Sequence, residues 1–285
     1  MFLPGALLLL IYHYVPAFGF VIAFQNFVPA KGIFHSKWVG WDNFTFLLQL
    51  PNFYQVVFNT LYISVMKVIA GQVVPIAVAI LLNEMRLRWV KRSVQTLIYL
   101  PHFMSWVILG GILIDILSPT KGIVNQVIRA FGGEPIFFLG TPSLFPYVLV
   151  GSDLWKDFGF STIVYLAALT SINPNLYEAA VVDGANRWKQ IVNITLPGMA
   201  PVIILMATLS LGQILNAGFE QVFNLYSPTV YETGDIIDTL VYRMGLVQAQ
   251  YALATAVGFF KSIVSLLLIS TSYYLAYRFA NYRIF

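Results

Sequence analysis

Residues 171–197, SINPNLYEAAVVDGANRWKQIVNITLP, carry the most informative pattern in this chain of 285 residues. The pair Asn173-Pro174 is typical of a helix start, because asparagine caps free backbone N–H groups and proline fits the first helical turn. The pair Asp183-Gly184 predicts the end of this helix, and Asn186 can cap a second one. The sequence therefore predicts two short helices at an angle, with Pro197 at the junction to the next apolar stretch.

The sequence on both sides of this stretch is mostly apolar. The whole chain is 59% apolar and 10% charged, whereas ordinary soluble domains are about 45–50% apolar and about 25% charged. A helix that spans a bilayer needs roughly 20 apolar residues. We therefore predict an all-α integral membrane protein, one transmembrane domain over residues 1–285, with residues 171–197 between the fourth and fifth of about six helices. The predicted spans are near residues 2–27, 56–82, 94–117, 144–170, 198–223 and 252–277.

Positive charges predict which ends of these helices face the cytoplasm, because Lys and Arg are held back on that side during insertion. The short connection 84–92 contains four of them. If it is cytoplasmic, residues 171–197 and both termini are cytoplasmic too. Arg187, Lys189, Arg278 and Arg283 then lie inside, and Lys31, Lys37, Lys121, Arg129 and Arg243 lie in three longer outer loops.

The N-terminal stretch is predicted to be a retained helix. A signal peptide begins with basic residues, and here no Lys or Arg precedes Lys31. Because no polar residue precedes Phe2, we expect a short cytosolic start before Met1.

Physical chemistry alone favours a plain interpretation of residues 171–197. Trp188, Ile191 and Val192 share one face of the second predicted helix. Such a face is typical of an amphipathic hairpin that lies on the inner membrane surface.

A family pattern favours a different interpretation. Glu178-Ala179-Ala180, then Gly184, then Ile194 and Leu196-Pro197 match every fixed position of EAA, three residues, G, nine residues, I-x-L-P. With this pattern the chain resembles the permease subunits of bacterial type I binding-protein-dependent ABC importers. The resemblance covers nearly the whole chain and points to the sugar branch associated with lipoprotein-linked and complex-polysaccharide uptake. Supporting stretches are Val15-Pro16 through Ala23-Phe24-Gln25, Trp38-Val39-Gly40, Asn59-Thr60 and Leu82-Asn83-Glu84.

The resemblance implies that the EAA stretch is a coupling helix, which inserts into a groove of a cytosolic ATPase and transmits its closure to the membrane helices. The residue types agree with this role, because small alanines allow close approach and glycine permits the turn. The expected coupling residues are Glu178, Ala179, Ala180, Asp183, Gly184, Ala185, Ile194, Leu196 and Pro197.

No phosphate-binding G-x-x-x-x-G-K-[ST] or G-x-G-x-x-G motif occurs in the sequence. We therefore expect that the chain is not an enzyme and binds no cofactor, and that ATP and Mg²⁺ belong to a separate ATPase subunit. No cysteine is present, and the three histidines are far apart, so no metal site is expected. The basic residues are scattered, which gives nucleic-acid binding little support.

The resemblance also implies the partners. These are a second, homologous permease subunit in a heterodimer, a cytosolic ABC ATPase dimer, and a periplasmic or lipid-anchored solute-binding protein. The expected location is the bacterial cytoplasmic (inner) membrane, with lipid around the helices.

Polar residues inside the spans are candidates for a translocation path, because a charge at mid-bilayer costs about 2.5–3.5 kcal/mol and so faces protein or a pore. Lys67 lies far inside the second span and is expected to face other helices. Gln213, Asn216 and Glu220 recur at three- and four-residue steps and predict one polar stripe along the fifth span. The alternative is that they form interhelical hydrogen bonds.

A second polar group lies near the start of the fourth span. Asp153, Lys156 and Asp157 follow the i, i+3, i+4 spacing and are expected to pair among themselves. Trp155 beside them can stack on a sugar ring. The candidates for substrate contact are Gln213, Asn216, Phe219, Glu220, Trp155 and Asp153. Lys261 in the sixth span is expected to pair with a carboxylate that the spacing does not identify.

Two functions of different class follow. The first is half of the translocation path of an ATP-driven importer for a sugar, with an oligosaccharide favoured by the aromatic outer loops. Five outer basic residues favour an acidic one, such as a fragment of alginate or pectin. The second is an autonomous secondary transporter or another polytopic membrane protein, for which internal repeats are expected. No convincing repeat relates the first three spans to the last three.

Overall fold

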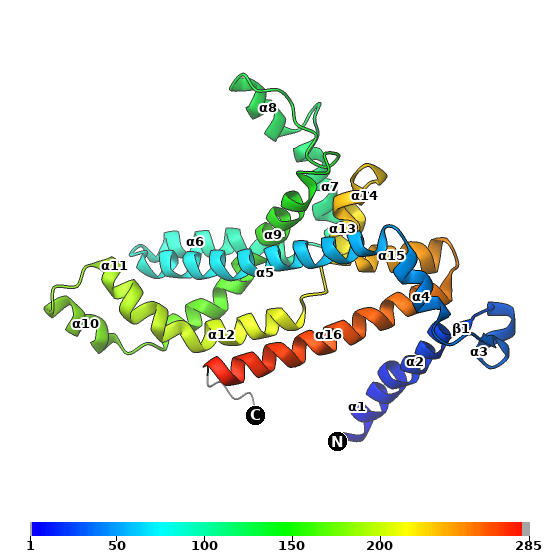
Figure 1. Ribbon diagram of the computed structural model, residues 1–285. Coiled ribbons are helices and arrows are strands. Elements are labelled where there is room, and N and C mark those ends of the chain that lie inside the picture. The colour runs from blue at the N-terminus through cyan, green and yellow to red at the C-terminus, as the bar shows by residue number, and fades with distance from the viewer. Residues whose placement is uncertain (1, 281–285) are drawn as a thin grey trace.

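The computed structural model describes residues 2–280, and most of them lie in helices (Figure 1). The predicted all-α fold class is confirmed. The helices that form the body of the molecule are α5 (Phe53–Glu84), α6 (Arg88–Tyr99), α7 (Trp106–Leu117), α9 (Phe145–Thr170), α12 (Leu196–Gly212) and α16 (Tyr251–Ala280).

Shorter elements precede and connect these helices. The N-terminal rod consists of α1 (Phe2–Leu9), the π-turn η1 (Leu10–Tyr14), α2 (Val15–Ala17) and the 3₁₀-helix η2 (Phe18–Phe24). Between the rod and α5 lie β1 (Gln25–Asn26), η3 (Pro29–Lys31), α3 (Gly32–His35), β2 (Lys37–Trp38) and α4 (Asp42–Gln49). The two strands are antiparallel, with Gln25 opposite Trp38.

The other connections are also mostly helical. They contain η4 (Leu100–Phe103), α8 (Ile123–Ala130), α10 (Pro174–Val182), α11 (Arg187–Gln190), the π-turn η5 (Ile191–Thr195), α13 (Phe219–Leu225), η6 (Pro228–Val230), α14 (Tyr231–Gly234), α15 (Ile237–Tyr242) and the π-turn η7 (Arg243–Val247).

Four helical segments of the described chain are long and apolar enough to cross a membrane, namely 3–24, 53–84, 187–212 and 251–274. A fifth is added if residues 88–103 and 106–117 count as one broken span. Helix α9 has 26 residues, but three charged side chains, Asp153, Lys156 and Asp157, interrupt its apolar sequence.

Two predicted spans are not continuous helices. Within 94–117, α6 and α7 are bent by 107°. Pro101 lies in the connecting 3₁₀ turn, and the Ser105 hydroxyl caps α7 by accepting from the Ile108 N–H at 3.4 Å. Within 198–223, α12 ends at Gly212 and α13 begins at Phe219. A hydropathy window averages over such short breaks, because their few polar residues, such as Gln213 and Asn216, lie between long apolar stretches.

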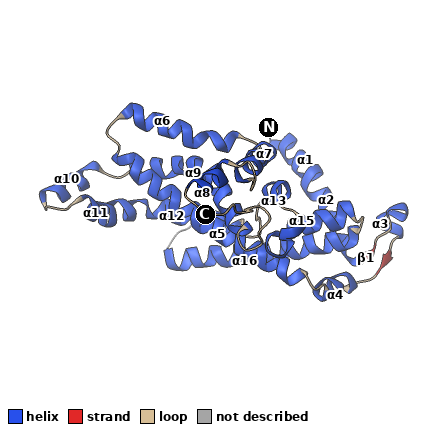
Figure 2. Cartoon of the chain, turned by 90° about the horizontal axis from the view of Figure 1, so that it is seen from above, coloured by secondary structure: helices blue, strands red, loops and turns tan. Residues whose placement is uncertain are grey.

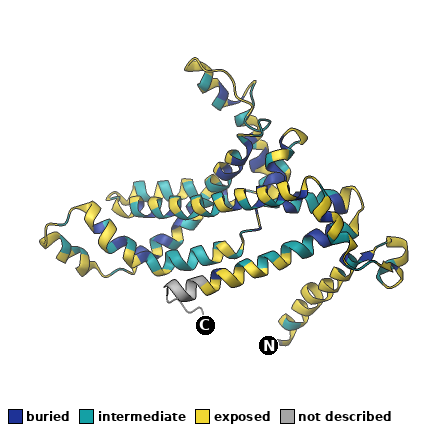
Figure 3. Ribbon diagram, viewed as in Figure 1, coloured by how far each residue is buried: buried dark blue, intermediate teal, exposed yellow. Residues whose placement is uncertain are grey.

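The core consists of three apolar clusters at different levels of the helix bundle. Helices α5 and α9 pack along each other, and α6 approaches α9 at Gly159, where an added Cβ would lie 2.0 Å from the Ile98 carbonyl oxygen. In contrast, α1 is almost wholly exposed (Figure 3). In a bilayer this exposed apolar surface faces lipid or a partner subunit.

Two groups of connecting elements lie at opposite ends of the long helices. Helices α10 and α11 lie at one end, near the end of α5, and the β1–β2 pair, α3 and α4 lie at the other (Figures 1 and 2). Arg187 at the start of α11 forms an ion pair with Glu84 at the end of α5, at 3.4 Å. The stretch 171–197 and the basic connection 84–92 therefore share one end of the molecule.

Candidate functional site

The stretch 171–197 folds into the two capped helices that the sequence predicts. The Asn173 side chain accepts from the Asn175 N–H at 3.0 Å, and the Asn186 side chain accepts from the Lys189 N–H at 2.9 Å. Between α10 and α11, Gly184 has a φ of +75°, a conformation that favours glycine. An added Cβ at Gly184 would meet no atom within 4 Å, so this glycine meets a conformational need rather than a steric one.

The second helix does not end at Pro197, contrary to the prediction of a junction there. Residues 187–212 form one continuous helix, with the π-turn η5 just before the proline. Because proline has no N–H and its ring crowds the preceding turn, the backbone widens at this point. Tyr177 of α10 contacts Thr195 of η5 through their hydroxyl oxygens, 3.0 Å apart. The loop is thus joined directly to α12.

The expected coupling residues divide into two groups. Those around the α10–α11 turn, Glu178, Ala179, Asp183 and Gly184, are exposed, while Ala180 and Ala185 are half-buried. In the second group, Ile194 and Leu196 are half-buried and Pro197 is exposed. Val182 at the tip of α10 is 87% exposed, and Trp188 on α11 is 71% exposed. Exposed apolar side chains at the tip form a surface suited to a protein partner or a membrane surface.

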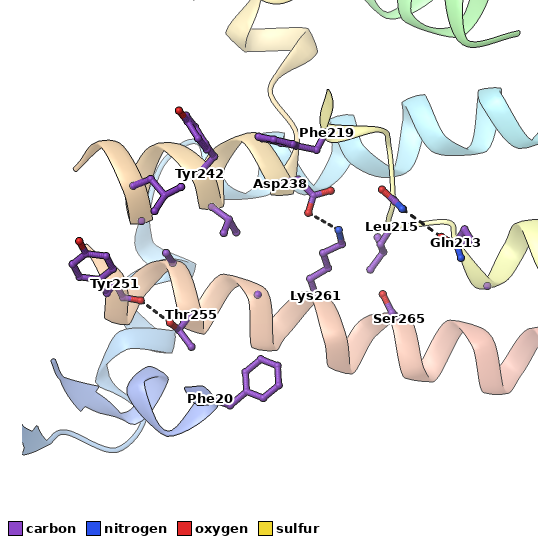
Figure 4. Close-up of a pocket in the computed structure, with 17 residues that line it drawn as sticks. Phe20, Gln213, Leu215, Phe219, Asp238, Tyr242, Tyr251, Thr255, Lys261 and Ser265 are labelled. Carbon is purple, nitrogen blue, oxygen red and sulfur yellow. Dashed lines mark hydrogen bonds and ion pairs between the residues drawn. The ribbon is translucent and has the colours of Figure 1, made fainter. Parts of the chain in front are cut away.

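A cavity of about 790 Å³ lies between the chain after α12 and helices α15 and α16, with η2 at its edge (Figure 4). Aromatic and hydrogen-bonding side chains line it together, a combination suited to a polar ligand with apolar ring faces. The polar and aromatic lining residues are Phe20, Gln213, Asn216, Phe219, Asp238, Tyr242, Tyr251, Thr255, Lys261 and Ser265.

An ion pair lies in the wall of this cavity. The Lys261 ammonium lies 2.5 Å from Oδ1 of Asp238. Asp238 is therefore the carboxylate partner that the sequence predicts for Lys261 without identifying it. Oδ2 of Asp238 is buried and has no hydrogen-bond partner within the described residues. No local pattern predicts this pair, since the two residues are 23 positions apart on different helices. The ion pair therefore joins α15 to α16 in the wall of the cavity.

The predicted polar stripe of the fifth span is wrong as a single helical face. The helix ends before Gln213, so Gln213, Asn216 and Glu220 do not follow one helical repeat. Gln213 and Asn216 are joined by a side-chain hydrogen bond of 3.3 Å and both line the large cavity. Phe219 lines it too, with its ring 5.6 Å from that of Tyr242. Glu220 is exposed and does not line it.

A second cavity of about 450 Å³ adjoins the first, and Gln213 and Asn216 line both. Its wall includes Lys67, Asp153 and Asp157. As expected, Lys67 faces other helices, and its ammonium lies 3.0 Å from Asp153 of α9. Trp155 is 40% exposed and lines neither cavity, because it lies on another face of α9.

The charges on α9 pair with other elements and not among themselves, contrary to the prediction. The Lys156 ammonium donates to the carbonyl oxygens of His102 and Met104 at 2.7 and 2.8 Å. Asp157 bonds to the His102 ring at 2.7 Å, and that ring stacks on Phe160. The bend between α6 and α7 exposes carbonyl groups that a lysine can satisfy, and this outweighs weak pairing along one helix.

A further ion pair ties the connection between α13 and α16 together. Arg243 bonds to both carboxylate oxygens of Asp235, at 3.1 and 2.5 Å. Its guanidinium also lies 4.7 Å from the ring centre of Tyr231. Burial, helped by Tyr231, raises the pKa of the nearby Tyr226 to about 12. One basic residue of this connection is therefore engaged inside the protein.

Comparisons with known proteins agree with one another. Residues 75–285 match the family described as the binding-protein-dependent transport system inner membrane component. The chain is 43% identical, over 285 residues, to the polygalacturonan/rhamnogalacturonan transport system permease protein YteP of Bacillus subtilis (strain 168). That alignment covers 100% of this chain and 89% of YteP.

Solved structures of ABC transporters contain chains with the same fold. The chain matches one in the crystal structure of a bacterial ABC transporter involved in the import of the acidic polysaccharide alginate, with a TM-score of 0.91 and 40% identity. The match covers 98% of this chain and 94% of that one. A chain of the bacterial alginate ABC transporter in complex with an alginate pentasaccharide-bound periplasmic protein gives a TM-score of 0.90, also at 40% identity, over 98% and 93% of the two chains.

Proposed function

The chain belongs to the family of binding-protein-dependent transport system inner membrane components, and from this premise we propose that it forms half of the translocation path of an importer for acidic oligosaccharides. Its fold is that of an ABC importer permease. The observation that carries the proposal is the likeness over essentially the full length to YteP and to the alginate importer permease.

The loop 171–197 is the coupling element of this permease. Its tip exposes Glu178, Asp183 and Val182, which offers carboxylates and an apolar contact to an ATPase groove. The continuous helix 187–212 connects the tip to the segment that lines the large cavity. Movement of the tip on ATP binding therefore reaches the cavity through one continuous helix. ATP and Mg²⁺ are bound by the separate ATPase subunits.

The cavity lined by Gln213, Asn216 and Phe219 is part of the sugar path. Aromatic rings and amide groups suit sugar rings, which have apolar faces and hydroxyl edges. Phe219 and Tyr242 supply the rings, and Gln213 and Asn216 supply the amides.

An acidic oligosaccharide is the substrate class. The names of YteP and of the matched importer refer to polygalacturonan/rhamnogalacturonan and to alginate. Four basic residues of the predicted outer loops are exposed, namely Lys31, Lys37, Lys121 and Arg129. Exposed positive charges on the outer side attract polyanions. The fifth, Arg243, is engaged with Asp235 and contributes less.

The partners are a second permease, an ATPase dimer and a solute-binding protein on the outer side of the cytoplasmic membrane. The end with α10 and α11 faces the cytoplasm. The ring of Phe24 at the end of the N-terminal rod lies 5.7 Å from that of Phe259 in α16, at the opposite end. The first and last helices thus meet on the outer side, and their other ends point to the cytoplasm.

Copurification tests the assembly. The tagged chain is expressed with its candidate ATPase and second permease, extracted in mild detergent and isolated. We expect both partners in stoichiometric amount. A chain that inserts into the membrane but recovers neither partner would contradict the proposal and favour an autonomous transporter.

The substrate class has a separate test. ATP turnover of the reconstituted complex is measured with the binding protein and oligogalacturonate, oligoalginate or neutral malto-oligosaccharides of equal length. We expect stimulation by a uronate oligosaccharide. Stimulation by the neutral sugars alone would refute the acidic class but leave the importer intact.

A further inference from the structure

The break between α12 and α13 requires partners for its backbone groups. The helix ends at Gly212 and resumes at Phe219, and Gly218 has a φ of +92°. Inside a membrane an unpaired carbonyl costs several kcal/mol, so irregular backbone persists only where protein groups or water satisfy it. At this break the Ala217 carbonyl oxygen accepts a hydrogen bond of 2.7 Å from the Lys67 ammonium.

Lys67 connects three elements at this point. A lysine ammonium has three N–H donors. Here they have three acceptors: Oδ1 of Asp153 on α9 at 3.0 Å, the Ala217 carbonyl, and the side-chain carbonyl of Gln221 on α13. The Lys67 side chain itself is 9% exposed. The ammonium therefore joins α5 and α9 to both sides of the break.

Gln221 extends the connection to α9. Its amide nitrogen donates to the Leu149 carbonyl and to the Ser152 hydroxyl, both at 2.7 Å, and its side chain is fully buried. All polar groups of this side chain thus have partners. An added Cβ on Gly218 would lie 3.1 Å from the Lys67 nitrogen, so the backbone approaches the ammonium closely.

The hydrogen bonds of Lys67 and Gln221 hold the segment 213–218, and this segment also faces the large cavity. Ala217 is fully buried beside Lys67, whereas Gln213 and Asn216, on the same segment, are exposed and line the cavity. Lys67 lines the smaller cavity and is not among the residues that line the large one. Its ammonium is engaged by Asp153, Ala217 and Gln221, so its influence on the large cavity passes through the segment.

We propose that Lys67 is a positioning residue for translocation: its ammonium fixes the 213–218 segment against α5 and α9, and so sets the positions of Gln213 and Asn216 toward the sugar. The proposal rests on the proposed function for the identity of the ligand. The geometry of the segment, however, can be tested without transport.

A cysteine reporter measures that geometry. The chain contains no cysteine, so Ala217→Cys introduces one thiol at a buried position. Labelling of this chain by a water-soluble maleimide is followed in the assembled complex in membranes, by the mass shift of its band. We expect slow labelling with Lys67 present. Labelling should be faster by about tenfold or more with Lys67→Met, because local opening exposes a site that a charged hydrogen bond kept closed.

Three variants keep the experiment interpretable. Lys67→Arg retains charge and donors and is expected to keep labelling slow. The pair Lys67→Met with Asp153→Asn avoids an unpaired carboxylate, which protects against misfolding from that charge alone. Gln72→Leu is the matched control, because Gln72 also lies on α5 and bonds to Tyr165 of α9 and Ser210 of α12, but not to the segment. Equal labelling in Lys67→Met and Gln72→Leu would overturn the proposal.

Transport gives the second readout. In proteoliposomes with the binding protein, Lys67→Met should raise the sugar concentration for half-maximal uptake by about tenfold, while Gln72→Leu should leave it within about twofold. An unchanged half-maximal concentration in Lys67→Met would overturn the positioning role. Failure of the unchanged protein to transport any sugar would instead contradict the proposed function, and the labelling result would still decide the role of Lys67.

Discussion

Replacing Gly184 with tryptophan should separate this permease from its ATPase while leaving the membrane domain folded. Gly184 has a φ of +75°, and a residue with a side chain in that conformation costs roughly 1–2 kcal/mol. An added Cβ there meets no atom within 4 Å, so the structure adds no steric term within the chain. This strain alone shifts the equilibrium between the formed and the opened α10–α11 turn by about 5–30-fold. It therefore weakens the turn without unfolding the protein.

The tryptophan ring has a second effect, outside the chain. Gly184 is exposed between α10 and α11, so the ring points to where an ATPase surface would approach. A bulky group inside a closely packed interface removes the contact, and we expect recovery of the copurifying ATPase to fall by more than about tenfold. The assay is affinity purification of the tagged chain, followed by quantification of each subunit and of sugar-stimulated ATP turnover.

A matched control distinguishes strain from lost contact. Gly132, after α8, has a φ of +81°, is exposed, and likewise has no atom within 4 Å of an added Cβ. Gly132→Trp therefore carries the same backbone strain far from the α10–α11 end. We expect it to retain the ATPase. Equal recovery of the ATPase with Gly184→Trp and Gly132→Trp would refute the role of this turn.

Two further predictions use pairs of residues with opposite environments. Gly159→Ala should destabilise the protein by about 1–3 kcal/mol, because the Cβ would lie 2.0 Å from the Ile98 carbonyl oxygen. An added Cβ at Gly151, on the same helix, meets no atom within 4 Å, so Gly151→Ala should leave the thermal unfolding midpoint nearly unchanged. Equal midpoints for Gly159→Ala and Gly151→Ala would show that the close α6–α9 contact does not contribute to stability. Gln213→Ala should raise the sugar concentration for half-maximal uptake by about tenfold through a lost hydrogen bond. Glu220 lines neither cavity, so Glu220→Ala should leave this concentration unchanged. A larger increase with Glu220→Ala than with Gln213→Ala would contradict the assignment of the large cavity to the sugar path.

The sequence predicted those features of the fold that depend on local chemistry. Asn173 and Asn186 cap the helices of the 171–197 stretch as expected, because capping needs only the residue and its next three neighbours. The apolar lengths of α5 and α16 likewise identify them as spans. The role of the EAA residues themselves rests on the family pattern and stays a prediction.

The features that the sequence did not predict depend on contacts between distant residues. Lys67 and Asp153 are 86 positions apart, and Asp153 pairs with Lys67 of α5 rather than with a charge on its own helix. The break after Gly212 is stabilised by Lys67 from another helix, which no local pattern around residue 213 reveals. Apolar sequence alone predicts that a helix continues there. Of the six substrate candidates, Gln213, Asn216 and Phe219 line the large cavity and Asp153 the small one, whereas Glu220 and Trp155 line neither.

ATP-driven uptake decides whether this chain is half of an ABC importer for acidic oligosaccharides. The complex of this chain, the second permease and the ATPase is reconstituted into vesicles with Mg-ATP inside, and the loaded binding protein with a radiolabelled uronate oligosaccharide is added outside. We predict accumulation of the sugar inside the vesicles that requires both ATP and the binding protein, and that is lost with Gly184→Trp in this chain. Accumulation that is independent of ATP, or that persists with Gly184→Trp, would contradict the account.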